Sequence, residues 1–131
     1  MVLAGVLLAA GCFATPTIDV RYDASTAQLR VGEVLRVTFG EINTSVGDSW
    51  YLIGEPDRSV LGAGAEDFES DDCPDGHSGC ASRLSWTFPA VGKGVTGLVF
   101  RYCYRSRPGP DCAPQVSRGP AEPVTLTVTV T

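Results

Sequence analysis

Cysteine is the residue type in this sequence with the widest range of chemistry, and its spacing narrows that range. The chain of 131 residues holds five cysteines. Structural zinc sites use cysteine pairs that are separated by about two to four residues. Here six residues separate Cys73 from Cys80, and eight separate Cys103 from Cys112. We therefore expect disulfide chemistry at these four cysteines and no metal site.

The pairing of the four cysteines is not fixed by their number, because more than one connectivity is open. Local spacing favours Cys73–Cys80 and Cys103–Cys112, since each pair brackets a segment rich in Gly and Pro. An even number of bridging cysteines is typical of proteins from an oxidising compartment. The sequence therefore predicts two small rings in an exported protein.

Cys12 follows an apolar run and suggests lipid chemistry. Residues 1–11 carry no charge, and the run is too short to span a bilayer, which takes about 20 apolar residues. It is typical of a secretory signal, and its end, "LAAGC", resembles a bacterial lipobox, in which the cysteine thiol is lipidated. The alternative is a buried N-terminal strand or helix. We expect a signal peptide at 1–11, a tether at 12–16, and a translation start that lies further upstream.

Lipidation of Cys12 predicts where the protein resides. Acyl chains on this cysteine would hold an exported protein at the outer face of the bacterial cell membrane. Residues 17–131 would then form the folded domain, which is the length of one ordinary domain. We expect this domain to be a monomer.

The histidine content argues against an enzyme. The chain has one histidine, His77, which lies inside the expected Cys73–Cys80 ring. Its neighbours Asp75 and Ser78 are too close in sequence to give the geometry of a catalytic triad. We predict a solvated loop histidine, no catalytic residues and no cofactor.

The acidic residues are concentrated in one segment. Six of the fifteen acids lie within residues 66–75, and the rest of the chain carries nine acids against ten bases. No basic patch is available for a phosphate backbone, so the composition argues against nucleic-acid binding. Calcium binding is an open alternative, but the spacing does not match a helix-loop-helix calcium loop. We expect a solvated, charge-dense loop.

The elements that must position these residues are β-strands. Apolar residues alternate or cluster in short runs between turn signals and do not recur at helical spacing. The last run, "PVTLTVTVT", places apolar and threonine side chains on opposite faces. About seven strands are indicated, in an all-β, immunoglobulin-like antiparallel sandwich. The expected runs are 17–22, 34–39, 50–53, 59–61, 84–88, 98–102 and 123–131.

Two long polar segments separate these runs, residues 62–82 and 105–122, and we read both as loops. Loops of this length in a compact domain are usually functional or disordered, and the expected disulfides argue for order. Large aromatic residues in the flanking strands are expected in the core of the sandwich: Trp50, Trp86, Phe88, Phe100 and Tyr102.

The stretch "VGEVLRVTFGEINTSVGDSW" resembles the first signature of the chagasin family of cysteine-peptidase inhibitors. In that family a strand headed by Gly-Asp/Glu-x-Leu leads into a loop Asn-Pro-Thr-Thr-Gly, then an aromatic residue and often Ser-Trp. The strand head matches at residues 32–35, and Ser45 is a conservative replacement for the first Thr. Three positions depart from the pattern, Thr44, Val46 and Asp48. Direct matches in and after the loop are Asn43, Gly47, Ser49 and Trp50.

The two later signatures are matched in part. The family has a Gly-rich loop ahead of an alternating strand, and Gly76 and Gly79 are the nearest equivalents here. It also has Arg-Pro-Trp after a strand of the form Leu-x-Phe-x-Tyr. This sequence has Arg107 and Pro108 in that place, with Gly109 where the Trp would stand.

The resemblance implies a function that the residues alone do not give. In the family three adjacent loops at one end of the sandwich enter the groove of a papain-like cysteine peptidase and inhibit it reversibly without a covalent bond. The alternative is a non-inhibitory surface lipoprotein that binds a protein or carbohydrate through the same loops. The expected peptidase-binding residues are Asn43, Thr44, Ser45, Val46, Gly47, Gly76, Gly79, Arg107 and Pro108.

Overall fold

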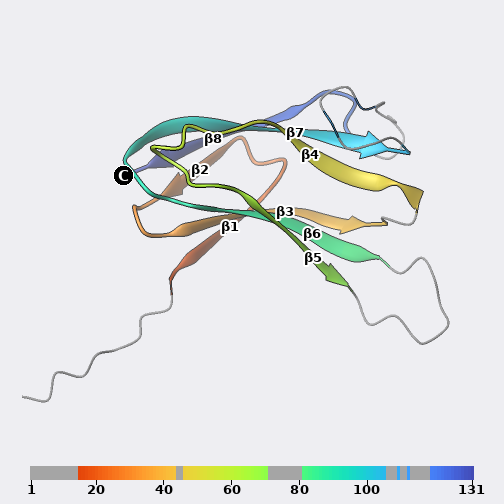
Figure 1. Cartoon of the computed structure of the whole chain (residues 1–131), viewed down its shortest axis with the longest axis horizontal. Coiled ribbons are helices and arrows are strands. Elements are labelled where there is room, and N and C mark those ends of the chain that lie inside the picture. The colour runs from red at the N-terminus through yellow and green to blue at the C-terminus, as the bar shows by residue number, and fades with distance from the viewer. Residues whose placement is uncertain (1–14, 44–45, 71–80, 106–108, 110–111, 113–118) are drawn as a thin grey trace, which may run out of the picture.

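The described part of the chain contains eight β-strands and no α-helix (Figure 1). The computed structural model describes residues 15–43, 46–70, 81–105, 109, 112 and 119–131. Within them, no helix is long and apolar enough to cross a membrane. The strands are β1 (Thr17–Arg21), β2 (Thr26–Leu29), β3 (Val34–Ile42), β4 (Asp48–Gly54), β5 (Ala65–Ser70), β6 (Ser82–Pro89), β7 (Gly94–Tyr104) and β8 (Val124–Val130).

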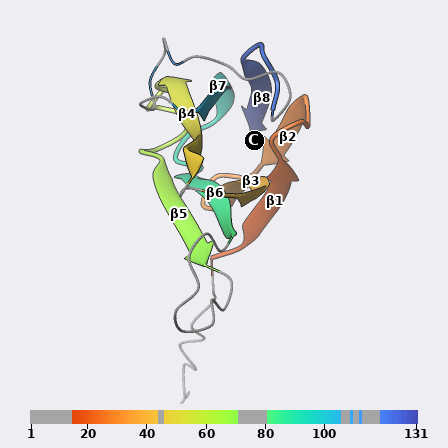
Figure 2. The ribbon, with the colours of Figure 1, turned by 90° about the vertical axis from the view of Figure 1, so that its right-hand side faces the viewer.

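The strands form two four-stranded sheets that face each other, as Figure 2 shows. One sheet has the order β1-β3-β6-β5 and the other β2-β8-β7-β4. Four pairings are antiparallel, whereas β1 pairs with β3 and β2 pairs with β8 in parallel. The all-β, immunoglobulin-like sandwich predicted from the sequence is confirmed.

The core lies between the sheets and follows from the alternation of side chains along each strand. In β3 the side chains of Leu35, Val37 and Phe39 are buried, while the residues between them are more exposed. In β8, Leu126, Val128 and Val130 are buried and the threonines at 125 and 127 are exposed. The period of two therefore sets which face of each strand enters the core.

An aromatic cluster fills the core beneath β4. The Trp50 ring lies 4.9 Å from the Phe39 ring and 5.4 Å from the Tyr102 ring, measured between centroids. The Phe39 ring also meets the Phe100 ring edge-on at 4.9 Å. These geometries are favourable for aromatic pairs. Trp50, Phe88, Phe100 and Tyr102 are buried as predicted, and Trp86 is partly buried against the same cluster.

Two strands were not expected from the sequence. β2 is short, and its core residues are only Ala27 and Leu29. β5 lies within residues 62–82, for which the sequence predicts a loop. It is the edge strand of its sheet, and all six of its residues are exposed. The acids Glu66, Asp67 and Glu69 therefore belong to a strand, and reading them as a solvated loop was wrong.

One expected strand is absent. Residues 59–61 form a turn in which the Asp57 carbonyl accepts hydrogen bonds from the N–H groups of Val60 and Leu61, each at 3.0 Å. Leu61 makes only an isolated bridge with Ala90. Val60 and Leu61 are nevertheless buried. Their apolar character reflects burial of a turn, and the strand prediction at this point was wrong.

The Cys103–Cys112 disulfide predicted from local spacing is present. The two Cα atoms are 5.6 Å apart and the sulfur atoms are bonded. Cys103 is at the end of β7, and both cysteines are buried. Cys73 and Cys80, which we expect to form the other bridge, lie outside the described residues, as does Cys12.

Candidate functional site

Three connections between strands leave the sandwich at one end, which we call the loop-bearing end (Figure 1). Strand β3 ends at Ile42, which pairs with Ser82 at the start of β6, and Ser82 pairs in turn with Ser70 at the end of β5. In the other sheet, Asp48 at the start of β4 pairs with Tyr104 at the end of β7. The flanks of the β3–β4, β5–β6 and β7–β8 connections are thus brought together.

The β3–β4 connection is a tight turn that is fixed at its base. The Asn43 carbonyl accepts hydrogen bonds from the N–H groups of Val46 at 3.3 Å and Asp48 at 3.2 Å. Gly47 has a φ of +85°, a backbone conformation that side chains disfavour. A Cβ at Gly47 would also lie 2.9 Å from the backbone nitrogen of Arg105. Glycine is therefore required here by conformation and by space.

The turn is joined to the β7–β8 connection across the two strands. The Arg105 N–H donates a hydrogen bond to the Gly47 carbonyl at 3.1 Å. Arg105 itself has a φ of 52°, and its guanidinium lies 5.3 Å from the centroid of the Tyr104 ring. A cation over an aromatic face is attracted by the ring quadrupole. Arg105 thus places a positive charge beside the turn.

The structure describes a minority of the peptidase-binding residues that the resemblance implied. Asn43 and Gly47 lie at the base of the turn, and the Val46 side chain packs partly buried against the core. The conformation of the turn and a core contact are therefore enough to explain these three residue types. The remaining residues, Thr44, Ser45, Gly76, Gly79, Arg107 and Pro108, lie outside the described residues.

Asp48 is a residue of this end that the sequence did not single out as functional. It stands where the family pattern has an aromatic residue. Its Oδ2 accepts a hydrogen bond from the Asn43 N–H at 3.2 Å, and its Oδ1 accepts one from the Tyr102 hydroxyl. Tyr102 is 54 residues away in sequence, so no local pattern reveals this pair. Both carboxylate oxygens are therefore occupied by the protein itself.

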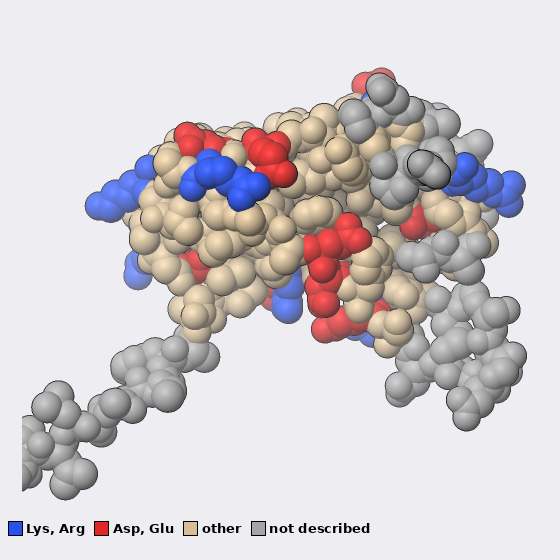
Figure 3. All heavy atoms as spheres, viewed as in Figure 1, with Lys and Arg blue, Asp and Glu red and all other residues tan. Residues whose placement is uncertain are grey.

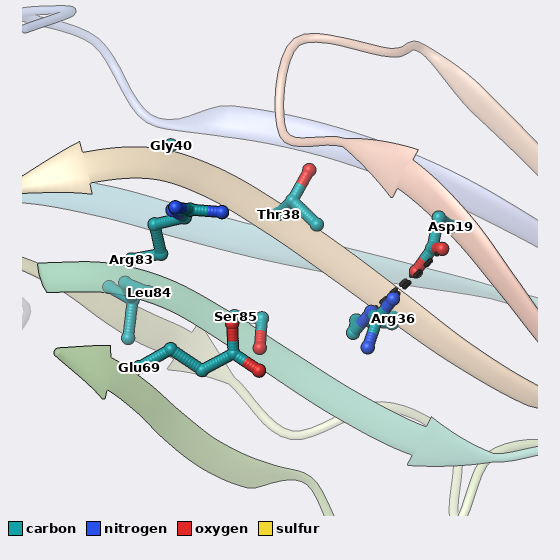
Figure 4. Close-up of a pocket in the computed structure, with 8 residues that line it drawn as sticks. All are labelled: Asp19, Arg36, Thr38, Gly40, Glu69, Arg83, Leu84 and Ser85. Carbon is teal, nitrogen blue, oxygen red and sulfur yellow. Dashed lines mark hydrogen bonds and ion pairs between the residues drawn. The ribbon is translucent and has the colours of Figure 1, made fainter. Parts of the chain in front are cut away.

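A polar hollow of about 330 Å³ opens on the outer face of the β1-β3-β6-β5 sheet (Figure 4). Arg36 donates to Asp19 through Nε at 2.5 Å and through a terminal nitrogen at 3.0 Å. This carboxylate raises the pKa of the Arg36 guanidinium above its ordinary value. Glu69 and Arg83 line the other side. Two cations and two anions balance, so the hollow does not concentrate ions of either sign.

Acidic side chains gather over β5, beside the loop-bearing end (Figure 3). Burial against the edge of the sandwich raises the pKa of the Glu66 carboxyl. Among residues 15–43, 46–70, 81–105 and 119–131, no three His, Cys, Asp or Glu side chains are grouped to hold a metal ion. The described strands therefore give this surface a negative charge. They do not form a cation site.

Solved structures share this fold, although no family model and no curated protein matches the sequence. The crystal structure of the cysteine protease inhibitor EhICP2 from Entamoeba histolytica aligns with a TM-score of 0.62 at 17% identity, over 89% of this chain and 97% of that chain. The solution structure of amebosin aligns with a TM-score of 0.61 at 18% identity, over 90% of this chain and 100% of that chain.

A third structure, PbICP-C in complex with falcipain-2, has a TM-score of 0.49 at 16% identity, over 92% of this chain and 94% of that chain. At these identities the first two structures establish a common fold. One of them is a cysteine protease inhibitor, which agrees with the family that the loop sequence resembles.

Proposed function

We propose that this protein is a reversible, non-covalent inhibitor of papain-like cysteine peptidases. The observation that carries the proposal is the convergence of the strand ends: the β3–β4, β5–β6 and β7–β8 connections all leave the loop-bearing end. The fold likeness to a cysteine protease inhibitor supports it. The residues that resemble the family signatures fall in these same connections.

The fixed base of the turn suits it to enter a narrow groove. Hydrogen bonds close its base at Asn43, and the Arg105 N–H holds the Gly47 carbonyl. A loop that is fixed before binding loses little conformational entropy when it binds, so more of the contact energy appears as affinity. The small residues Thr44 and Ser45 would then present backbone and short side chains to the peptidase.

Titration against papain tests this proposal. We expect inhibition at sub-micromolar concentration, and Thr44→Arg should weaken it at least roughly tenfold, which corresponds to about 1.4 kcal/mol. Thr125→Arg is the matched control, because Thr125 is exposed on β8. No inhibition of papain-like peptidases at high micromolar concentration would overturn the proposal and favour the non-inhibitory binding module.

We further propose that lipid on Cys12 anchors the protein at the outer face of the bacterial membrane. The support is the apolar run ending in "LAAGC", together with a domain whose first strand begins at Thr17. Mass spectrometry of the N-terminal peptide from the membrane fraction tests the anchor. Acyl chains on Cys12 are the expected finding, and an unmodified thiol on a mature N-terminus would contradict it.

A further inference from the structure

Asp48 occupies an unusual place for a carboxylate. It lies two residues before the buried Trp50, so both side chains project from the same face of β4, toward the sandwich interior. A carboxylate on such a face is costly unless hydrogen bonds satisfy it. Both oxygens are satisfied, one by the Asn43 N–H and the other by the Tyr102 hydroxyl. The backbone ladder pairs Asp48 with Tyr104 and does not require this diagonal contact.

Tyr102, which bonds Asp48, also contacts the β7–β8 connection. Its ring lies against Gly119, where a Cβ would come within 2.6 Å of the ring atoms. The Cys112 sulfur lies 3.5 Å from the Tyr102 carbonyl oxygen, and Cys112 is bonded to the neighbouring Cys103. One face of Tyr102 thus meets parts of the chain that follow β7, while its hydroxyl meets Asp48.

Asp48 and Tyr102 therefore bridge two of the three connections at the loop-bearing end. The Asp48 carboxylate holds the base of the 43–47 turn, and Tyr102 is packed into the β7–β8 connection. The Arg105–Gly47 hydrogen bond joins the same two connections through the backbone. Two independent contacts thus fix their relative position.

We propose that Asp48 is a positioning residue, whose carboxylate sets the 43–47 turn relative to the β7–β8 connection through Tyr102. This inference rests on the proposed inhibitory function for its consequence, but the coupling itself is a property of the free protein. Under the proposed function both connections would contact the peptidase groove at once, so an error in their relative position would weaken both contacts. The carboxylate acts by alignment and need not touch the peptidase.

The test is a double-substitution cycle with amide hydrogen exchange in the absence of peptidase. Asp48→Ala should speed exchange at the Arg105 and Cys112 amides by roughly tenfold or more, the loss expected for a hydrogen bond to a charged group. Tyr102→Phe, which removes only the hydroxyl, should speed exchange at the Val46 amide. In the Asp48→Ala background it should add little, because the bond is already lost.

Two further variants separate the role of Asp48 from a general loss of stability. Asp48→Asn should retain most of the coupling, because its amide can accept from Asn43 and donate to the Tyr102 oxygen. Asp19→Ala is the control, since Asp19 pairs with Arg36 on the outer sheet face. Exchange at Arg105 and Cys112 that is the same in Asp48→Ala and Asp19→Ala would overturn the positioning role.

Inhibition is then measured on the same purified proteins. We expect Asp48→Ala to weaken papain inhibition roughly tenfold or more at a temperature where it remains folded, with Asp48→Asn restoring most of it. If Asp48 only stabilised the fold, Asp48→Ala would lower the melting temperature but leave inhibition unchanged at a temperature where the variant is folded. That result would contradict the inference. If the wild type fails to inhibit any such peptidase, the proposed function is wrong, and the exchange cycle still decides the coupling.

Discussion

At the scale of single residues, Gly47 shows how backbone conformation and space act together at the candidate site. Its φ of +85° disfavours a side chain, and a Cβ would lie 2.9 Å from the backbone nitrogen of Arg105. Gly47→Ala should therefore lower the free energy of unfolding by about 1–3 kcal/mol. Urea unfolding followed by tryptophan fluorescence measures the change.

Gly97→Ala is the matched control for this prediction. Gly97 is exposed in β7, and a Cβ there would meet nothing within 4 Å. Alanine in an extended strand position should leave stability unchanged or raise it by up to about 1 kcal/mol, because the unfolded chain loses freedom. Equal effects of the two substitutions would show that the Gly47 conformation is not a constraint.

Glu66 gives a prediction about pH. Partial burial raises the pKa of its carboxyl above the ordinary value of 4.5. Because the folded state then binds this proton more tightly than the unfolded state, Glu66 favours folding below pH 4.5, and that contribution is lost as pH rises through the raised pKa. Glu66→Gln should therefore be more stable than the wild type at pH 7.

The size and shape of this effect can be checked by thermal unfolding across the pH range. The side chain is largely exposed, so solvent screening limits the gain to under about 1 kcal/mol. The advantage of Glu66→Gln should shrink as pH falls toward 4. An advantage that grows on acidification would have the wrong sign for a carboxyl whose pKa is raised.

At the scale of elements, the disulfide closes the end of β7 against the connection that follows it. Cys103 and Cys112 are 9 residues apart, and a ring of this size should stabilise the fold by about 2–3 kcal/mol on the chain-entropy model. The double variant Cys103→Ala/Cys112→Ala should lose this free energy of unfolding, measured by urea unfolding.

The bridge should also resist reduction. Since both cysteines are buried, reductant alone should not open the bridge in the folded protein. Thiol release without denaturant within minutes would contradict this protection.

The strands that the sequence predicts are those that bury one face. In β3, β7 and β8 the core residues alternate over a long enough run to be recognised, and the Cys103–Cys112 pair brackets a short ring. β5 escapes such reasoning because it is an edge strand with no buried side chain. It forms through its backbone pairing with β6, and its acidic sequence contains no pattern that predicts this pairing.

The candidate site was predictable only in its local part. The requirement for Gly47 follows from a turn motif, and the turn does lie between two strands. The long-range contacts that hold it come from Arg105, which bonds Gly47, and from Tyr102, which bonds Asp48; both are distant in sequence. Their approach depends on the register of β4 against β7, a tertiary property that a residue pattern does not contain.

At the scale of the whole molecule, the chain enters and leaves the sandwich away from the loop-bearing end. β1 runs parallel to β3, which ends there, so Thr17 lies toward the opposite end. β8 runs antiparallel to β7, so Thr131 also lies there, as the C label in Figure 1 shows. If Cys12 is lipidated, residues 13–16 allow a tether of under about 20 Å. The anchor and the three connections would then sit at opposite ends.

This polarity predicts that anchoring leaves inhibition intact. The lipidated protein in phospholipid vesicles should inhibit soluble papain within about threefold of the unanchored Cys12→Ala variant, because the membrane lies beyond the far end of the domain. A tenfold difference corresponds to about 1.4 kcal/mol, so it is readily resolved in a titration. Inhibition that is tenfold weaker on vesicles would mean that the loop-bearing end faces the bilayer. Inhibition that recovers only when the tether is lengthened by a Gly/Ser segment would instead point to crowding by the membrane surface, and would equally contradict the prediction.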